Sequence, residues 1–284
     1  HWHETADETA RLARLMLLNE NYQACLIPDA LWLDALMNGL RAETNPLLFS
    51  TITSYISTPL RALPSALREG PEEGLLRLSA SHPQRSSRQR LLRMLIHSAA
   101  SPATLARLYA IWRDRSEPLL NETDYTDLAY SLAVRLPDRS DSIVRTQRAR
   151  LTDPDRIRRF DFIARAMTPD TAALDTLFRS LLIPENRRIE PWTSALLGWL
   201  NHPTRERHAV RYIRPALDAL RDVQRTGDIF FPRDWLGALL RNHRSPEAYR
   251  ELLNFLDANP NYPPLLLNKI WQAAYPLYRE NEKR

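Results

Sequence analysis

The stretch SPATLARLYAIW, residues 101–112, shows how this chain is built. Its serine can cap the N-terminus of a helix, and its proline suits the first helical turn, where the missing N–H is not needed. Leu105, Leu108, Tyr109 and Trp112 follow at the spacing that puts side chains on one face of a helix. The stretch therefore predicts a helix that begins at its proline and buries one apolar face.

The same apolar spacing recurs along the chain. Each recurrence places apolar residues at i, i+3, i+4 and i+7, which is the period of an amphipathic helix. Together they predict roughly a dozen or more helices of about 10–20 residues, joined by short connections. The stripes are Leu92, Leu95, Ile96 and Ala99; Tyr125, Leu128, Ala129 and Leu132; Leu174, Leu177, Phe178 and Leu181; Ile213, Ala216, Leu217 and Leu220; and Tyr249, Leu252, Leu253 and Leu256.

A capping residue followed by proline marks several further helix starts. We expect the prolines to lie between helices or in first turns, because a proline inside a helix costs about 3 kcal/mol. Carboxylates follow several of these pairs, where the helix dipole favours them. The predicted starts are Asn45-Pro46, Asp153-Pro154, Thr168-Pro169, Ser245-Pro246 and Asn259-Pro260.

Composition favours an all-α protein. The chain has six glycines, where average usage would give about 20, and valine is rare. No segment alternates with the period of a strand over a useful length. We predict a superhelical stack of antiparallel helix pairs, a HEAT- or armadillo-like α-solenoid, forming a single domain over residues 1–284. The Ser-rich residues 81–90 are expected to form its most mobile loop and to lie nearest to a domain boundary.

The run QRTGDIFFPRDWLGALL, residues 224–240, is interpreted as a helix junction. Gly227 is expected to end one helix in the left-handed conformation. Pro232 suits the first position of the next helix, and Asp234 then lies near its positive end. The apolar side chains between these helices are expected to be mostly buried, as a plug under the junction: Ile229, Phe230 and Phe231.

The ends and the single cysteine limit the classes of protein. The chain begins with HWHETADETA rather than Met, and no signal-peptide pattern follows, so we expect a fragment or a processed chain. No apolar run approaches the roughly 20 residues that span a bilayer, and we expect no membrane partner. The lone Cys25 excludes an internal disulfide and a metal site built from cysteines.

No metal or catalytic motif is complete. HETAD, residues 3–7, resembles the start of the zinc motif H-E-x-x-H, but Asp7 stands where the second histidine ligand is needed. The other histidines are scattered, and no nucleophile elbow, phosphate loop or dinucleotide fingerprint is present. We therefore expect no catalytic residue, no metal and no cofactor in this chain; an independent enzyme would need bound zinc.

Arginine dominates the basic residues, and two clusters are candidate anion sites. Of 39 basic residues only Lys269 and Lys283 are lysines, and 34 acidic residues are interspersed, so nucleic acid is an unlikely partner. The clusters can bind a peptide carboxylate, or can form ion pairs with the carboxylates around them. The tryptophans are interpreted as core residues. The candidate peptide-binding residues are Arg150, Arg156, Arg159, Arg187 and Arg188.

Several short motifs resemble one known family when they are taken in order. They are PDRIRRFDFI at 154–163, NRRIEPW at 186–192, LNHP at 200–203 and TGDIFFPRDWL at 226–236. In this order they are similar to the C-terminal helical region of bacterial zinc aminopeptidases of the aminopeptidase N family, and most to forms from Bacteroides-like bacteria. The similarity is strongest over residues 120–275 and looser before them.

The resemblance implies a role beside a catalytic domain. In that family a β-rich domain and a thermolysin-like domain come first, and the latter carries H-E-x-x-H, a distant glutamate zinc ligand and a G-x-M-E-N loop, none of which is in this chain. The resemblance implies a non-catalytic helical domain that caps the active-site chamber and helps to admit and position peptides. Its partners would be the catalytic domain of the same polypeptide, which holds the zinc, and peptide substrates, with export to the cell envelope.

A second function class stays open from the residues alone. A stand-alone α-solenoid could bind a protein or a nucleic acid through the Arg-rich face at residues 145–159. Binding to nucleic acid would weaken steeply with salt, because each phosphate contact releases counterions.

Overall fold

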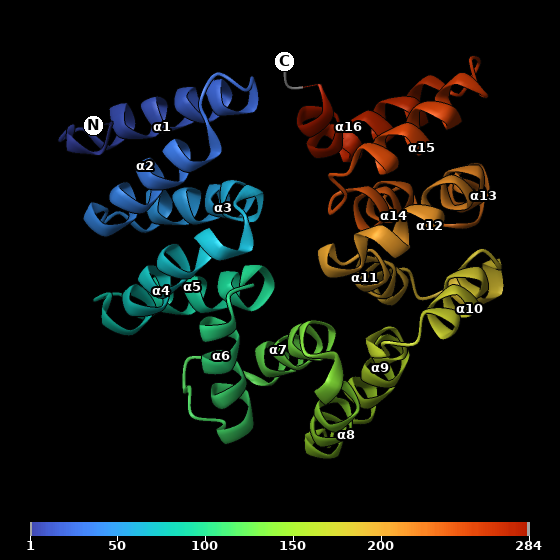
Figure 1. Ribbon diagram of the computed structural model, residues 1–284, viewed down its shortest axis with the longest axis horizontal. Coiled ribbons are helices and arrows are strands. Elements are labelled where there is room, and N and C mark those ends of the chain that lie inside the picture. Colours follow the sequence, from blue (N-terminus) through green and yellow to red (C-terminus); the bar gives the residue numbers. More distant parts are fainter. Residues whose placement is uncertain (1, 283–284) are drawn as a thin grey trace. The chain divides into compact units, whose positions relative to one another are not determined.

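The computed structural model describes residues 2–282, which form sixteen α-helices and a few short 3-10 helices, with no strand in that range (Figure 1). The predicted all-α class is confirmed. The chain divides into two compact units, His1–Leu132 (unit 1) and Ala133–Arg284 (unit 2). The division falls within helix α7 (Glu122–Arg135). The loop expected at residues 81–90 is confined to residues 82–84, because helix α5 already begins at Arg85, and the division between the units does not fall there.

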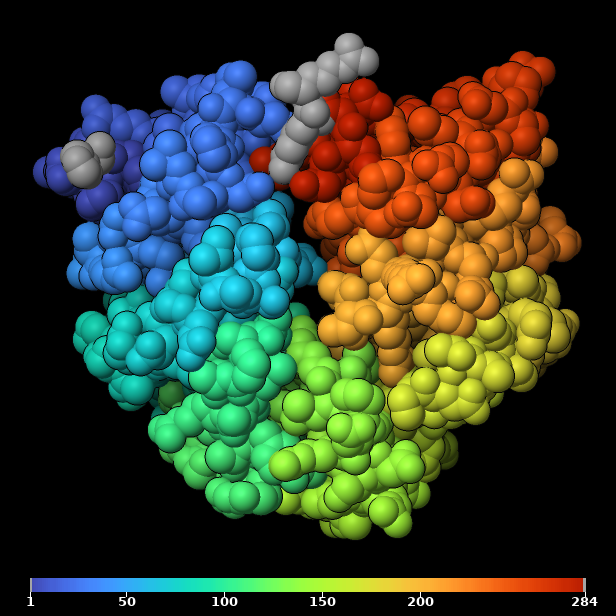
Figure 2. Space-filling view, in the orientation of Figure 1, coloured from blue at the N-terminus to red at the C-terminus, as the bar shows by residue number. Residues whose placement is uncertain are grey.

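Unit 1 is built from helices that pack on their neighbours and next neighbours. Helix α2 packs on α3 and α4 on α5, while α3 also packs on α5 and α4 on α6. This order of contacts is compatible with the expected solenoid. The surface of unit 1 follows the chain order from blue to green in Figure 2. The helices are α1 (Glu8–Gln23), α2 (Asp29–Ala42), α3 (Pro46–Ala62), α4 (Ser65–Ser81), α5 (Arg85–Ser98), α6 (Pro102–Asp114) and most of α7.

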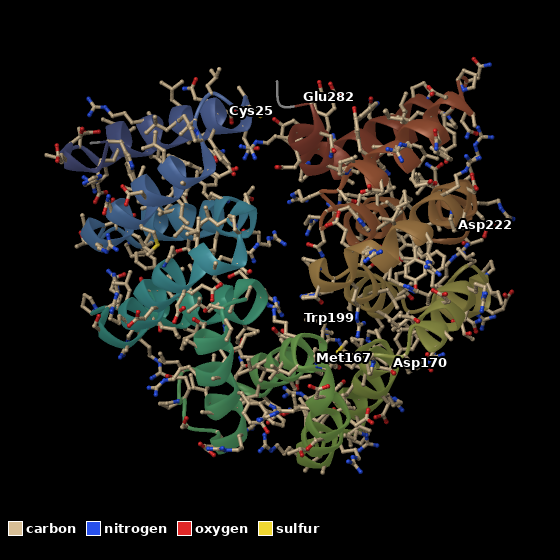
Figure 3. The ribbon with its side chains drawn as sticks, viewed as in Figure 1. Cys25, Met167, Asp170, Trp199, Asp222 and Glu282 are labelled. Carbon is tan, nitrogen blue, oxygen red and sulfur yellow. The ribbon has the colours of Figure 1, made fainter. Side chains whose placement is uncertain are left out.

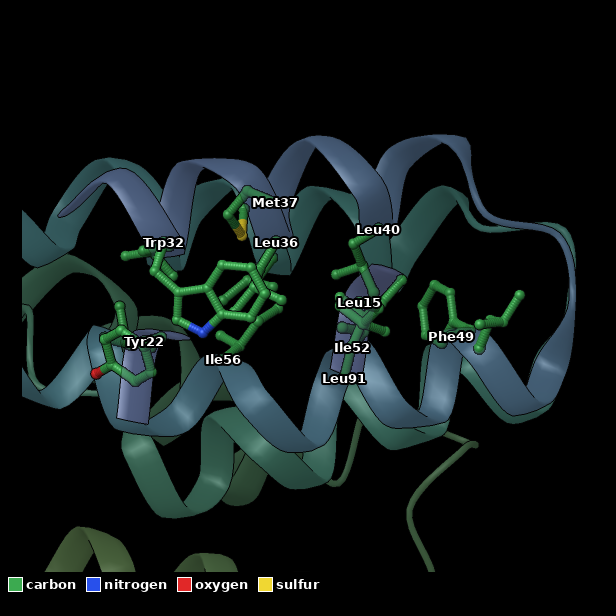
Figure 4. Packing of buried hydrophobic residues seen from close by; sticks show 14 of the residues in the cluster. Leu15, Tyr22, Trp32, Leu36, Met37, Leu40, Phe49, Ile52, Ile56 and Leu91 are labelled. Atoms are coloured by element: carbon green, nitrogen blue, oxygen red, sulfur yellow. The ribbon is translucent and has the colours of Figure 1, made fainter. Parts of the chain in front are cut away.

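A cluster of large apolar side chains forms the core of the first helices (Figure 4). Trp32 of α2 is almost fully buried and stacks on Tyr22 of α1, with ring centroids 5.9 Å apart. The hydroxyl of Tyr22 donates to Asp29, so the polar end of the ring is satisfied as well. Burial of each such side chain stabilises the unit by about 1.5–3 kcal/mol.

Unit 2 contains shorter helices with a similar pattern of packing. Helix α14 packs on α11 and on α16, while α12 packs on α15 and α9 on α11. None of the helices in the described part of the chain has the length and apolar character needed to span a bilayer. The helices are α8 (Ser140–Arg150), α9 (Pro154–Ala164), α10 (Thr171–Leu181), α11 (Glu190–Leu200), α12 (Glu206–Asp218), α13 (Leu220–Thr226), α14 (Phe231–Leu240), α15 (Pro246–Asp257) and α16 (Pro264–Asn281).

Four of the predicted helix starts are confirmed and two are wrong. Helices α3, α6, α9 and α15 begin at the proline of their capping pair, and the capping side chain accepts a backbone N–H of the first turn. Thr168-Pro169 does not start α10, because Asp170 caps that helix and it begins at Thr171. Asn259-Pro260 lies in a turn, and α16 begins at Pro264.

The expectation that prolines avoid helix interiors is also wrong. Pro59, Pro71, Pro215 and Pro276 lie inside α3, α4, α12 and α16. Each removes a backbone hydrogen bond from its helix, and packing of the helix against its neighbours must offset that loss.

The junction at residues 224–240 differs from its prediction at two points. Gly227 has φ −110° and ψ 179°, an extended conformation rather than a left-handed one. Of the expected plug only Phe231 is buried, whereas Ile229 and Phe230 are 78% and 59% exposed. Asp228 accepts the N–H groups of Phe230 and Phe231 and so starts α14 one residue before Pro232, which leaves the two preceding apolar side chains outside the helix packing.

Two buried glutamates and one half-buried glutamate satisfy the backbone at three of the proline-led helix starts. In each case one carboxylate accepts the N–H of the capping residue and the N–H of the residue before it. These N–H groups precede the helix and have no helical partner. The contacts run from Glu43 to Thr44 and Asn45 (3.0 and 2.8 Å), from Glu72 to Ala100 and Ser101 (2.8 and 3.0 Å), and from Glu206 to Arg244 and Ser245 (2.5 and 2.7 Å).

Replacement of Glu72 by alanine should lower the free energy of unfolding by about 3 kcal/mol, because the buried N–H and hydroxyl of Ser101 and the partly buried N–H of Ala100 lose their acceptor. Urea denaturation measures the change. The matched control is Glu73→Ala on the same helix, whose carboxylate forms an exposed ion pair with Arg77 and should contribute at most about 0.5 kcal/mol. Equal effects of the two substitutions would contradict the role given to Glu72.

Candidate functional site

The first arginine cluster lies on helices α8 and α9. Arg150 is the last residue of α8, and Arg156 and Arg159 lie three residues apart on α9. Arg156 is exposed, and the other two are half-buried. Within residues 2–282, the guanidinium groups of Arg156 and Arg159 have no hydrogen-bond or ion-pair partner. Residues three apart are neighbours on a helix surface, so these two groups can meet one anion.

Other arginines of the same stretch form ion pairs within it. Nε of Arg148 lies 2.6 Å from a carboxylate oxygen of Asp161, and Arg158 pairs with Asp155. Both pairs are exposed and contribute little to stability. The cluster is therefore mixed: part of it is neutralised as the ion-pair interpretation expects, and part of it keeps unpaired donors.

The second cluster separates into one buried and one exposed arginine. Arg187 is only 2% exposed, and its guanidinium donates to the carbonyls of Leu181 and Leu182 at 3.3 and 3.0 Å. The same group pairs with Asp222 of α13, which is labelled in Figure 3, and donates to Thr226. Arg225 and Arg187 together lower the pKa of Asp222. Arg187 thus holds α10 to α13, whereas Arg188 is exposed and keeps its donors unpaired within residues 2–282.

Side chains that lie close to residue 227 at this junction explain why that residue is a glycine. Glu190 at the start of α11 accepts the N–H of Asp228 at 2.9 Å. A Cβ atom at Gly227 would lie 2.5 Å from the ring of Phe231 and 2.9 Å from the Glu190 carboxylate. A side chain at residue 227 would therefore separate α13 and α14 from α11.

A buried histidine forms a second polar junction in unit 2. Nε2 of His243 donates to the side-chain oxygen of Asn201 at 2.9 Å, and the Asn201 amide donates to Leu197. Nδ1 of His243 lies 3.7 Å from Glu206, at ion-pair rather than hydrogen-bond distance. Asn201 belongs to the LNHP motif, so this motif joins the end of α11 to the start of α15.

The environment of Glu206 favours its ionised form. Burial by itself would raise the pKa of this carboxyl, but His243 and the N–H groups of Arg244 and Ser245 outweigh it and lower the pKa to about 2. The carboxylate is therefore ionised at neutral pH in the folded chain. It ties α12 to α15 through backbone groups that are near it only in the folded state.

One further cluster contains a histidine and a carboxylate in hydrogen-bond contact. Asp175 of α10 accepts from the Tyr212 hydroxyl at 2.7 Å and lies 2.7 Å from Nε2 of His208, both on α12. Burial opposes a lower pKa for Asp175, yet the contacts from Tyr212 and His208 outweigh it, and the pKa falls. The ring nitrogen that contacts Asp175 also lies 3.1 Å from the Tyr212 hydroxyl. The cluster is best described as a polar clamp between α10 and α12.

The zinc-like sequence near the N-terminus is not assembled on one helix. His3 and Glu4 lie in a 3-10 turn, Trp2–Glu4, while Asp7 caps α1 by accepting the N–H of Ala10 at 2.6 Å. His1 lies outside the described residues. Across residues 2–282, no group of three His, Cys, Asp or Glu side chains is placed to hold a metal ion.

The sequence could not predict the polar junctions, because their partners are far apart along the chain. Glu72 and Ser101 are separated by 29 positions, and Asn201 and His243 by 42. Nothing in the sequence next to any one of these residues distinguishes it from an ordinary polar surface residue. The proline-led helix starts were the available signal, since each must satisfy its backbone N–H groups somehow.

Comparisons with known proteins add no family to these observations. No family model matches the sequence, and no curated protein matches it.

Low pH should lower the stability of unit 2, because Glu206 loses its charge there. Because the pKa of about 2 in the folded chain lies below the ordinary value of 4.5, the carboxylate stabilises the fold above pH 4.5, and this contribution is lost as the pH falls towards 2. The difference corresponds to about 3 kcal/mol. Chemical denaturation at pH 7 and pH 3 should show that Glu206→Gln loses stability at pH 7 and depends less on pH than the wild type. The control Glu247→Gln, at an exposed carboxylate on α15, should change stability by less than about 1 kcal/mol at either pH.

Proposed function

We propose that this chain is the non-catalytic C-terminal helical domain of a zinc aminopeptidase, where it caps the active-site chamber and helps to position peptide substrates. The zinc and the catalytic residues would belong to a preceding domain of the same polypeptide. In this proposal the chain contributes a wall of helices and a few exposed cationic groups.

The observation that supports the proposal most is the meeting of two of the family-like motifs at one junction. Arg187 and Glu190 come from NRRIEPW, and Thr226, Gly227 and Asp228 come from TGDIFFPRDWL. Arg187 donates to Thr226, and Glu190 accepts from Asp228, although the two motifs are about 40 positions apart. Two motifs that carry the resemblance are thus in contact in the folded chain. Such contact is expected if the resemblance reflects a shared helical scaffold.

The arginines without a partner give this scaffold a means of contacting a peptide. Arg156, Arg159 and Arg188 keep donors that have no partner within residues 2–282. A guanidinium can bind a carboxylate through two parallel hydrogen bonds, which fixes its orientation as well as its position. We therefore place the carboxyl end of a peptide near α9, with Arg150 at the adjoining end of α8. Arg187 is left out of this proposal because it is buried and its two terminal nitrogens are bonded inside the fold.

The experiment is steady-state kinetics on the polypeptide that includes this chain and the H-E-x-x-H domain expected upstream of it. The double substitution Arg156→Ala, Arg159→Ala should raise KM about tenfold for a peptide with a free carboxylate and leave kcat unchanged. The same peptide with an amidated C-terminus should be unaffected. Arg158→Ala on the same helix, which removes an arginine already paired with Asp155, is the matched control.

Two results would count against the proposal. An unchanged KM for the free-carboxylate peptide would show that the arginines do not contact the peptide carboxylate. A reading frame without an H-E-x-x-H domain would show that the chain is not part of a zinc aminopeptidase. Salt-dependent binding of the chain to DNA or RNA would instead favour a stand-alone scaffold.

A further inference from the structure

A polar groove in unit 1 is lined by helices α3 and α5. Its volume is about 480 Å³, within the range of roughly 300–1,000 Å³ that small-molecule sites occupy. Four basic side chains line it, and no carboxylate does: Arg61 of α3, and Arg90, Arg93 and His97 of α5. Its other lining residues are mostly hydroxyl and amide side chains, so the groove offers hydrogen-bond donors together with positive charge.

The basic residues of α5 form a row along one face. Arg90, Arg93 and His97 are three and four positions apart, which places them above one another on an α-helix. At a rise of 1.5 Å per residue the row extends over about 10 Å. A ligand with more than one anionic group, spaced along its length, would meet several of these cations at once.

One of the arginines is held in place from the side. Nε and a terminal nitrogen of Arg93 donate to the two carboxylate oxygens of Asp124 on α7, at 2.7 and 3.0 Å. Asp124 is nearly buried, and its side chain raises the pKa of Arg93, with a smaller contribution from Asp127. Arg93 is thus preorganised but largely neutralised. It can position a ligand without supplying the surplus charge.

The surplus positive charge comes from the neighbouring residue along the row. Arg90 is exposed, and its guanidinium has no hydrogen-bond or ion-pair partner within residues 2–282. Arg61 faces the same groove from α3, where its Nε donates to the carbonyl of Ser57 at 3.2 Å. The hydroxyl of Ser57, also in the lining, donates to no described group. Charge and donors therefore converge on the groove from both helices.

We propose that this α3–α5 groove binds a small oxyanion ligand that carries two or more phosphate or carboxylate groups, with Arg90 as the main charged contact. Arg93 and Arg61 orient the ligand from the two helices, and Ser57 supplies a hydroxyl donor. The site is independent of the peptide contact on α9, which lies in unit 2.

The test is isothermal titration calorimetry on the full chain at low ionic strength, with sodium pyrophosphate in one arm and sodium citrate in the other. At least one of the two should bind saturably with a Kd of about 1 mM or tighter, and the tighter one identifies phosphate or carboxylate as the preferred group. Arg90→Gln should weaken that binding about tenfold, the loss expected for a charge-assisted hydrogen bond.

The matched control is Arg250→Gln, at an exposed arginine of α15 without a partner within residues 2–282, which makes the same change of net charge. It should change the Kd less than about twofold. Because Arg90 and Arg250 are exposed, both variants should keep the thermal midpoint of the wild type. Absence of saturable binding to either anion would overturn the proposal, as would equal weakening by the two substitutions.

Discussion

Glutamate carboxylates that accept backbone N–H groups hold three of the proline-led helix starts in place, and two of these carboxylates, Glu43 and Glu72, are buried. Glu43, Glu72 and Glu206 each bind the capping residue of a proline-led helix and the residue before it. These two N–H groups precede the first turn of the helix, so the helix itself supplies no acceptor for them. In a buried junction each would cost about 1–3 kcal/mol if it stayed unsatisfied. The negative charge also lies at the positive end of the helix dipole. Helix pairs on either side of the junction are thereby fixed to one another.

Local pattern was enough to predict the all-α class and four of the proline-led helix starts, whereas contacts between residues far apart along the chain could not be predicted from it. The stripe Leu105, Leu108 and Trp112 is buried on α6, as its spacing indicated. By contrast, Gly227 is required because the Phe231 ring and Glu190 lie against it, and only the folded chain brings Glu190 there. The exposure of Ile229 and Phe230 has the same origin, since Asp228 starts the next helix without them.

The candidate site, too, could be predicted from the sequence only in part. Sequence could identify arginine clusters, but not which members serve the fold. Arg187 is held by two backbone carbonyls and Asp222. Arg205 likewise donates to the carbonyls of Ala166 and Thr168, which follow α9, and burial lowers the pKa of Arg205 to about 10. Arg156 and Arg159 differ from them because their guanidinium groups have no hydrogen-bond or ion-pair partner within residues 2–282. In this chain arginine is thus used at helix C-termini much as glutamate is used before N-termini, and a minority of arginines keeps donors for a ligand.

Amide hydrogen exchange tests the role of these glutamates most directly. Residues at and before a helix cap normally exchange fast, because no helical hydrogen bond protects them. With the carboxylate contacts in place, the amides of Ser101 and Ser245 should exchange as slowly as amides within α6 and α15. Exchange as fast as that of Thr152, an exposed loop residue whose amide has no partner within residues 2–282, would contradict the account.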